Sequence, residues 1–145
     1  GSPYRPVIHI QDVCAAFISG LKAPVKIISG QAFNVGIKDG NYTVRKLAEV
    51  AQELVPGSKL TFTNEHGNDS RTYKVSFKRI LSELKDYYKP KYDLDLGGLE
   101  LLDYFKKVNF TTNDLDGEKT IRLNKLKKLR KENTIDTKFY FNENL

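Results

Sequence analysis

The stretch Val7-Ile8-His9-Ile10-Gln11-Asp12-Val13-Cys14-Ala15-Ala16-Phe17-Ile18-Ser19-Gly20-Leu21-Lys22 decides the fold. Residues 7–10 are a short β-branched run bounded by Pro6, which predicts a strand. Asp12 then predicts the cap of a helix over roughly residues 13–22. This helix is apolar nearly all round, and a helix of that kind lies between two layers of structure. We therefore expect it to have packing partners on both faces.

Three more elements are expected before residue 63. The run at 32–36 is apolar and closed by a glycine, which predicts a second short strand. Thr43 is a good N-cap, and the apolar residues of 44–55 recur on one helical face until Pro56-Gly57 ends the helix. Residues 60–62 alternate in polarity as a strand does.

The second half of the chain predicts helices. Ser76 is placed to cap an amphipathic helix that extends through residue 84. Leucines and an aromatic at helical spacing over 96–105 mark a further helix. From Asn109 the composition changes to Thr, Asn and Asp, which predicts a boundary between a body, residues 1–109, and a basic helical tail, residues 110–145. Short strands among amphipathic helices predict an α/β fold of the α+β type.

Composition limits the class of protein. The chain has 145 residues, the length of one domain, and 39% of them are apolar, which is enough for a folded body. Its one cysteine, Cys14, excludes a disulfide framework, argues against a metal cluster and favours a reducing cytoplasm. No apolar run approaches the ~20 residues that span a bilayer, so no membrane partner is expected.

The net charge of +6 is concentrated in one segment. Residues 118–131 hold 7 of the 24 basic and 1 of the 18 acidic residues, so the rest of the chain is neutral. Leu123, Leu126 and Leu129 share one arc of a predicted helix there. Two interpretations follow: the leucines dock while the lysines form a solvated face, or the segment binds nucleic acid or another anionic surface. The segment has no aromatic residue for base stacking, so we expect nucleic acid to be an unlikely partner.

Residues 66–73, His-Gly-Asn-Asp-Ser-Arg-Thr-Tyr, form a polar, turn-rich stretch that predicts a loop. Glycine, asparagine and aspartate at 67–69 predict a turn that presents Arg71 from a loop edge. An arginine side chain has a rigid fork of donors that suits a phosphate. The plain alternative is a solvated surface arginine. Arg5, near the other end of the body, is a second arginine that could face the same ligand.

Several motifs together resemble the carboxyl half of the extended short-chain dehydrogenase/reductases, the NAD-dependent epimerases and dehydratases of nucleotide-diphosphate sugars. The match covers roughly residues 3–108. Its motifs, in family order, are Tyr-Arg-Pro-Val-Ile-His-Ile-Gln-Asp at 4–12, Gly-Gln-Ala-Phe-Asn-Val-Gly at 30–36, Asn41 before a helix, and Gly-Asn-Asp-Ser-Arg-Thr-Tyr at 67–73 before Phe77-Lys-Arg-Ile. Arg122-Leu123 with Ile135-Asp136 is similar to a tail found in one subgroup.

The resemblance implies a substrate-binding role. Arg5 and Arg71 match family arginines that grip the substrate diphosphate, and Asn41 matches an asparagine beside the substrate cleft. A nucleotide-diphosphate sugar is the implied ligand. In such enzymes the first strand and helix of the carboxyl half pack against the cofactor domain. The implied partner of the 13–22 helix is therefore the amino-terminal half of the same protein.

The chemistry of the family is not carried by this chain. No Gly-x-Gly-x-x-Gly turn is present, so the NAD or NADP of the intact enzyme is not expected to bind this chain alone. The proton-transfer pattern Tyr-x-x-x-Lys occurs at Tyr42/Lys46, where the tyrosine precedes the helix cap, and at Tyr87/Lys91, where Pro90 breaks any helix. We therefore expect a fragment with no catalytic residue, inactive alone, that self-associates through its uncovered apolar surface. A purely structural interaction domain is the third interpretation.

Overall fold

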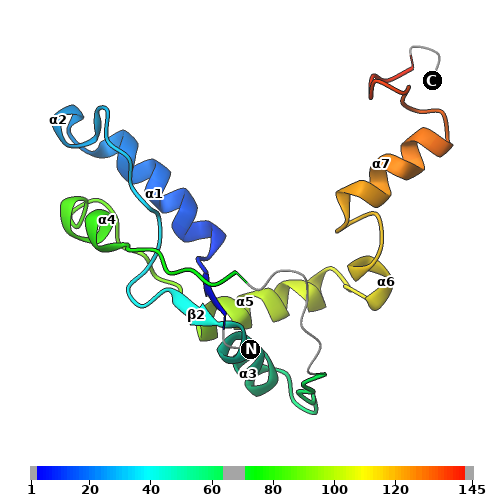
Figure 1. Cartoon of the computed structure of the whole chain (residues 1–145), viewed down its shortest axis with the longest axis horizontal. Coiled ribbons are helices and arrows are strands. Elements are labelled where there is room, and N and C mark those ends of the chain that lie inside the picture. The colour runs from blue at the N-terminus through cyan, green and yellow to red at the C-terminus, as the bar shows by residue number, and fades with distance from the viewer. Residues whose placement is uncertain (1–2, 64–70, 143–145) are drawn as a thin grey trace. The chain divides into compact units, whose positions relative to one another are not determined.

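The computed structural model describes residues 3–63 and 71–142, which form a small α+β structure, mostly helical, with a two-stranded antiparallel sheet (Figure 1). The chain divides into two compact units, residues 1–101 and 102–145. No helix among the described residues is both long enough and apolar enough to cross a membrane.

The sheet of the first unit joins β1, Tyr4–Pro6, to β2, Asn41–Thr43. The two strands are antiparallel, with Arg5 opposite Tyr42. β2 leads directly into α3, Val44–Leu54, and the Thr43 hydroxyl accepts a hydrogen bond from a backbone N–H of the first turn at 3.1 Å. The predicted cap at this position is therefore confirmed.

The predicted strand at 7–10 is wrong. Strand pairing involves Tyr4–Pro6 instead, and α1 already begins at Ile10 and runs to Lys22. His9, rather than Asp12, is the N-cap, because its Nδ1 accepts from the backbone N–H of Gln11 at 3.2 Å. An imidazole nitrogen can replace the usual capping oxygen because it, too, is an acceptor.

Asp12 has a different task, in the first turn of α1. It is buried, and its two carboxylate oxygens accept from the backbone N–H groups of Lys91 and Tyr92 at 2.9 and 3.0 Å. This carboxylate therefore ties the start of α1 to the segment that precedes α5, Leu94–Lys107. The buried charge is tolerated because both oxygens are hydrogen-bonded.

The core of the first unit lies between α1 and the segment around α4, Lys78–Glu83. Short α2, Val25–Ile28, follows α1. The buried core residues are Ala16, Ala23, Phe77, Ile80, Leu84 and Tyr88. The Tyr88 hydroxyl donates to the carbonyl of Gly36 at 3.1 Å, and burial, with the nearby Asp12 carboxylate, raises the pKa of Tyr88 to about 12. Only one face of α1 contributes to this core.

Two other predicted strands are also wrong. Residues 32–36 have no partner strand among the described residues; Phe33 and Val35 instead pack directly on the core cluster. Residues 60–62 are irregular as well. The predicted cap at Ser76 is wrong, because α4 begins after Phe77 and has no side-chain cap. The Ser76 carbonyl accepts from the side chain of Asn34 at 3.3 Å.

The helix expected over 96–105 is confirmed as α5, Leu94–Lys107, and the division between the two units falls within it. The second unit also contains α6, Thr112–Leu115, and α7, Arg122–Lys131. α6 begins with a capping box at Thr111. The predicted boundary between 1–109 and 110–145 stays a prediction.

Candidate functional site

The structure brings Arg5 to the segment that carries Arg71. Nη1 of Arg5 donates to its neighbour's carbonyl, that of Tyr4, at 2.9 Å and to the carbonyl of Arg71 at 2.5 Å. Arg5 lies on β1, and Arg71 lies in segment 71–77, which has no regular secondary structure. The two predicted site arginines, far apart in sequence, are therefore neighbours in the fold. The turn predicted at 67–69 lies outside the described residues.

Aromatic contacts support the same junction. The Arg5 guanidinium carbon lies 5.6 Å from the ring centre of Tyr73, and the Lys74 ammonium lies 3.9 Å from the ring centre of Tyr4. The backbone N–H of Tyr4 donates to the Thr72 hydroxyl at 3.0 Å. Cations on aromatic faces lose rotamer freedom before a ligand arrives, which favours binding. These neighbours were not among the predicted site residues.

Asn41, the third predicted residue, holds the arginine segment in place. Its side-chain amide donates to the carbonyl of Val75 at 2.9 Å and accepts from the N–H of Val75 at 2.8 Å. The side chain thus pairs with a backbone as a neighbouring strand would. Because Asn41 lies on β2 opposite Pro6, it connects the sheet to segment 71–77.

The residues that meet at this junction carry a net positive charge. Segment 71–77 contains two basic residues, Arg71 and Lys74, and no acidic one, and Arg5 adds a third positive charge. Arg71 is exposed and Arg5 half-buried. A site of this kind suits an anionic group, and the contact with the Arg71 carbonyl holds the Arg5 guanidinium against segment 71–77.

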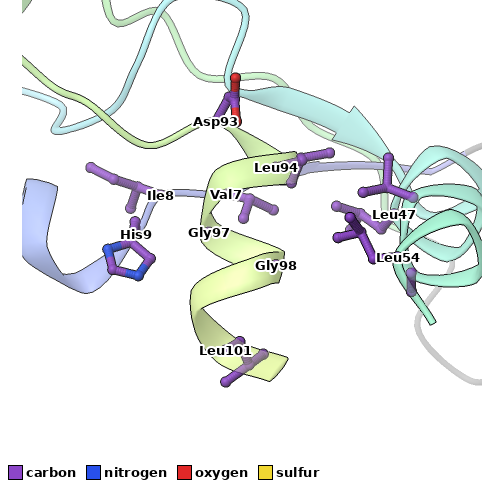
Figure 2. Close-up of a pocket in the computed structure, with 12 residues that line it drawn as sticks. Val7, Ile8, His9, Leu47, Leu54, Asp93, Leu94, Gly97, Gly98 and Leu101 are labelled. Atoms are coloured by element: carbon purple, nitrogen blue, oxygen red, sulfur yellow. The ribbon is translucent and has the colours of Figure 1, made fainter. Parts of the chain in front are cut away.

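A second feature of the first unit is a mainly apolar pocket of about 280 Å³ between α3, α5 and the segment before α1 (Figure 2). Figure 2 shows α5 with His9 on one side and Leu54 on the other. A methyl group added at Gly98 would lie 2.3 Å from a Leu54 methyl, so the glycine permits the close approach of α3 and α5. Asp93 accepts from an N–H of the first turn of α5 at 2.9 Å.

A polar cluster borders this pocket. His9 stacks on Tyr92, with ring centres 3.9 Å apart, and its Nε2 lies 3.2 Å from a carboxylate oxygen of Glu100. Gln11 donates to the other oxygen of Glu100 at 2.8 Å. Loss of hydration, followed by the charge of Glu100, raises the pKa of Tyr92. The cluster joins α1 to α5, and no group of metal-binding side chains occurs among the described residues.

Neither Tyr-x-x-x-Lys pair has the geometry of a proton-transfer pair. Tyr42 lies on β2 while Lys46 lies on α3, and Tyr87 follows the end of α4. Loss of hydration on burial, with smaller effects of nearby carboxylates, raises the pKa of Tyr42. A tyrosine that serves as a base needs the opposite shift.

In the second unit, part of the basic charge is engaged by acidic residues. Glu118 lies 2.9 Å from the Lys128 ammonium and 3.5 Å from that of Lys125, and these contacts lower the pKa of Glu118. Asp114 pairs with Lys119 at 2.6 Å, and that hydrogen bond, with those from Thr111, lowers the pKa of Asp114 to about 2. The exposed cations of α7 beyond these pairs remain available for a ligand.

Comparison with models of known protein families and with solved structures gives no match for this chain.

Proposed function

We propose that this chain is the substrate-binding part of an NAD-dependent epimerase or dehydratase of nucleotide-diphosphate sugars, and that it grips the substrate diphosphate. Its fold would then be the carboxyl-terminal portion of an extended short-chain dehydrogenase/reductase. The contact between the Arg5 guanidinium and the Arg71 carbonyl supports this proposal, because it places two motif arginines at one junction.

The proposed chemistry is electrostatic. A diphosphate offers several oxygens, and two guanidinium groups can donate to it from two sides. Each charged hydrogen bond contributes about 1.5–3 kcal/mol where water is excluded, and less where it is not. Asn41 acts indirectly in this scheme: by pairing with the backbone of Val75, it keeps the segment that carries Arg71 against the sheet.

The cofactor belongs to the amino-terminal half in this proposal. The residues of this chain do not fit NAD or NADP, because the sequence has no glycine-rich turn between a strand and a helix to receive a pyrophosphate. The role of this chain is therefore limited to holding the substrate. The single thiol, Cys14, favours a reducing cytoplasm as its compartment.

The test uses the intact enzyme, in which the chain is joined to its amino-terminal half. Arg5→Ala and Arg71→Ala should each weaken binding of the nucleotide sugar by 1.5–3 kcal/mol, or roughly tenfold to a hundredfold in dissociation constant, measured by calorimetry. NAD affinity should change much less. The matched control is Arg45→Ala, which removes an exposed arginine on α3 that stacks on Phe62.

Two results would contradict the proposal. Substrate affinity that is unchanged in both variants would return Arg5 and Arg71 to the role of surface arginines. Micromolar affinity of the isolated chain for NAD would show that the cofactor site lies in this chain and not in the amino-terminal half. The gene upstream of residue 1 gives an independent check, because the proposal requires it to encode a glycine-rich turn and a Tyr-x-x-x-Lys pair.

A further inference from the structure

Three consecutive aromatic residues are exposed near the end of the second unit. Phe139, Tyr140 and Phe141 are 56%, 70% and 72% exposed. Aromatic rings bury large areas when they find a partner, so a cluster of three in water indicates a contact surface. We call residues 139–141 the aromatic tip.

The aromatic tip is held by a short hairpin. The backbone N–H of Asp136 donates to the carbonyl of Tyr140 at 2.9 Å, and an Asp136 carboxylate oxygen accepts from the N–H groups of Lys138 and Tyr140 at 2.8 and 3.0 Å. Ile135, at the base of the hairpin, is buried and bridges to Phe141. The tip is therefore a defined turn.

The same hairpin is attached to α7. The backbone N–H of Thr134 donates to the carbonyl of Leu129 in the last turn of the helix at 2.9 Å. In Figure 1 the hairpin follows directly on the carboxyl-terminal end of α7. The aromatic tip and the basic helix thus belong to one part of the second unit.

α7 presents a face of positive charge. The helix contains six basic residues and no acidic one. Lys127, Arg130 and Lys131 are three and four residues apart, so they lie on one face, and all three are exposed. Within the residues that the structure describes, no ion pair involves any of them, whereas Lys125 and Lys128 pair with Glu118.

We propose that this part of the second unit binds single-stranded nucleic acid, with the phosphates on the α7 cations and the bases stacked on the aromatic tip. A cationic surface beside exposed rings is the arrangement by which proteins bind single strands without sequence preference. Residues 118–131 have no aromatic side chain, and the hairpin supplies what that segment lacks. The inference is independent of the proposed function, which concerns residues of the first unit.

An anionic membrane is the competing partner, and the structure favours it less. A helix that lies in a membrane interface needs a broad exposed apolar face. On α7, Leu126 and Leu129 are half-buried, which leaves Leu123 as the exposed leucine. The helix therefore offers cations rather than an apolar face.

The experiment measures fluorescence anisotropy of a labelled oligothymidine of about 20 nucleotides, long enough for one binding site, with the full chain in KCl from low to physiological concentration. The logarithm of affinity should fall with the logarithm of salt with a slope of about −2, the value for three neutralised phosphates on a single strand. A dissociation constant weaker than roughly 100 µM in low salt, the weak end of non-specific binding, overturns the proposal.

The cation variant combines Lys127→Gln, Arg130→Gln and Lys131→Gln. It should weaken binding at least tenfold in low salt and remove most of the salt dependence, because the neutralised phosphates are lost. The matched control removes three exposed lysines from the first unit instead, at Lys38, Lys85 and Lys89. Equal losses in the two variants would mean that net charge alone drives binding, and would overturn the assignment to α7.

The aromatic variant combines Tyr140→Ala and Phe141→Ala, and should weaken binding about tenfold with the salt slope unchanged, because stacking carries no charge. Tyr104→Ala, at an exposed aromatic on α5, is the control. The exchange Tyr140→Phe with Phe141→Tyr keeps both rings and should retain full affinity, which separates lost stacking from misfolding. Wild-type affinity in the alanine variant overturns the role of the tip. Binding to phosphatidylserine vesicles without binding to the oligonucleotide assigns the surface to membranes.

Discussion

The two faces of α1 have opposite surroundings. The inner face, with Ala16 and Ser19, is buried against the core around Ile80. The outer face carries Phe17 and Leu21, which are 74% and 88% exposed. The helix is therefore half covered, where the sequence alone predicts partners on both sides.

The two faces of α1 therefore differ in whether this chain supplies their packing partner. The inner face meets rings and branched side chains from residues 77–88 of the same unit. The outer face has a stripe of large apolar side chains, which are rarely left in water over such a length without a partner. We infer that the inner face stabilises the fold and that the outer face is an association surface.

The largest expected effect concerns the outer face. Burying a further ~500 Å² of apolar surface gains on the order of 12 kcal/mol before the entropy of association is subtracted. The isolated chain should therefore form dimers or larger species at micromolar concentration. Phe17→Asp with Leu21→Asp should abolish this association, because two charges would have to be buried. Sedimentation velocity in low and high salt measures it.

The control for association places the same two charges elsewhere, as Thr61→Asp with Thr137→Asp, at exposed positions. These changes should leave the sedimentation unchanged. If the wild-type chain is a monomer in both salts, the outer face of α1 needs no second copy, and the contrast between the two faces has no consequence for association.

The next effect concerns the inner face. Ile80 is 1% exposed, and Ile80→Ala should lower the free energy of unfolding by about 2–5 kcal/mol, since it removes buried methyl groups and leaves a cavity. Leu21→Ala removes a similar side chain from the outer face and should cost less than about 0.5 kcal/mol under conditions where the chain is monomeric. Urea denaturation compares the two. Equal losses would show that both faces are covered.

The sequence predicted the helices of this unit better than its strands. α3 and α5 have periodic apolar residues, and α3 has a threonine cap, so local signals define them. The strand predictions at 7–10 and 32–36 failed because a short apolar or β-branched run shows only a preference for extended backbone. Whether it forms a strand depends on a partner, and β1 found its partner some forty residues away.

Only part of the candidate site could be predicted, because contacts between distant segments, like strand pairing, leave no local pattern in the sequence. Arg5, Asn41 and Arg71 came from motifs, and the structure brings Arg5 and Arg71 together. The contributions of Thr72 and Lys74 depend on a contact with the first strand, and no local pattern in one sequence encodes a contact between distant segments. The nitrogen cap at His9 was missed because capping preferences favour oxygen side chains.

A smaller effect tests the polar anchor of the inner face. Asp12→Ala removes a buried carboxylate that accepts from the N–H groups of Lys91 and Tyr92, and should lower the free energy of unfolding by about 1.5–3 kcal/mol. Asp86→Ala, at an exposed carboxylate in a turn, is the control. Hydrogen exchange should speed up at the amides of residues 91 and 92 first. Unchanged exchange there would mean that Asp12 does not anchor this segment.

The smallest effects concern two glycines: Gly36, which is packed against the buried core, and Gly20, which lies inside α1 with open space beside it. A methyl group at Gly36 would lie 2.3 Å from ring carbons of buried Phe77, so Gly36→Ala should cost about 1–3 kcal/mol of stability by overpacking. A methyl group at Gly20, inside α1, meets no atom within 4 Å. Gly20→Ala should therefore raise the free energy of unfolding by roughly 0.5–1 kcal/mol, the helix preference of alanine. Thermal denaturation of both variants measures this difference in sign. A loss of stability in Gly20→Ala would show that another element covers α1 at this position, and the outer surface would then begin farther round the helix.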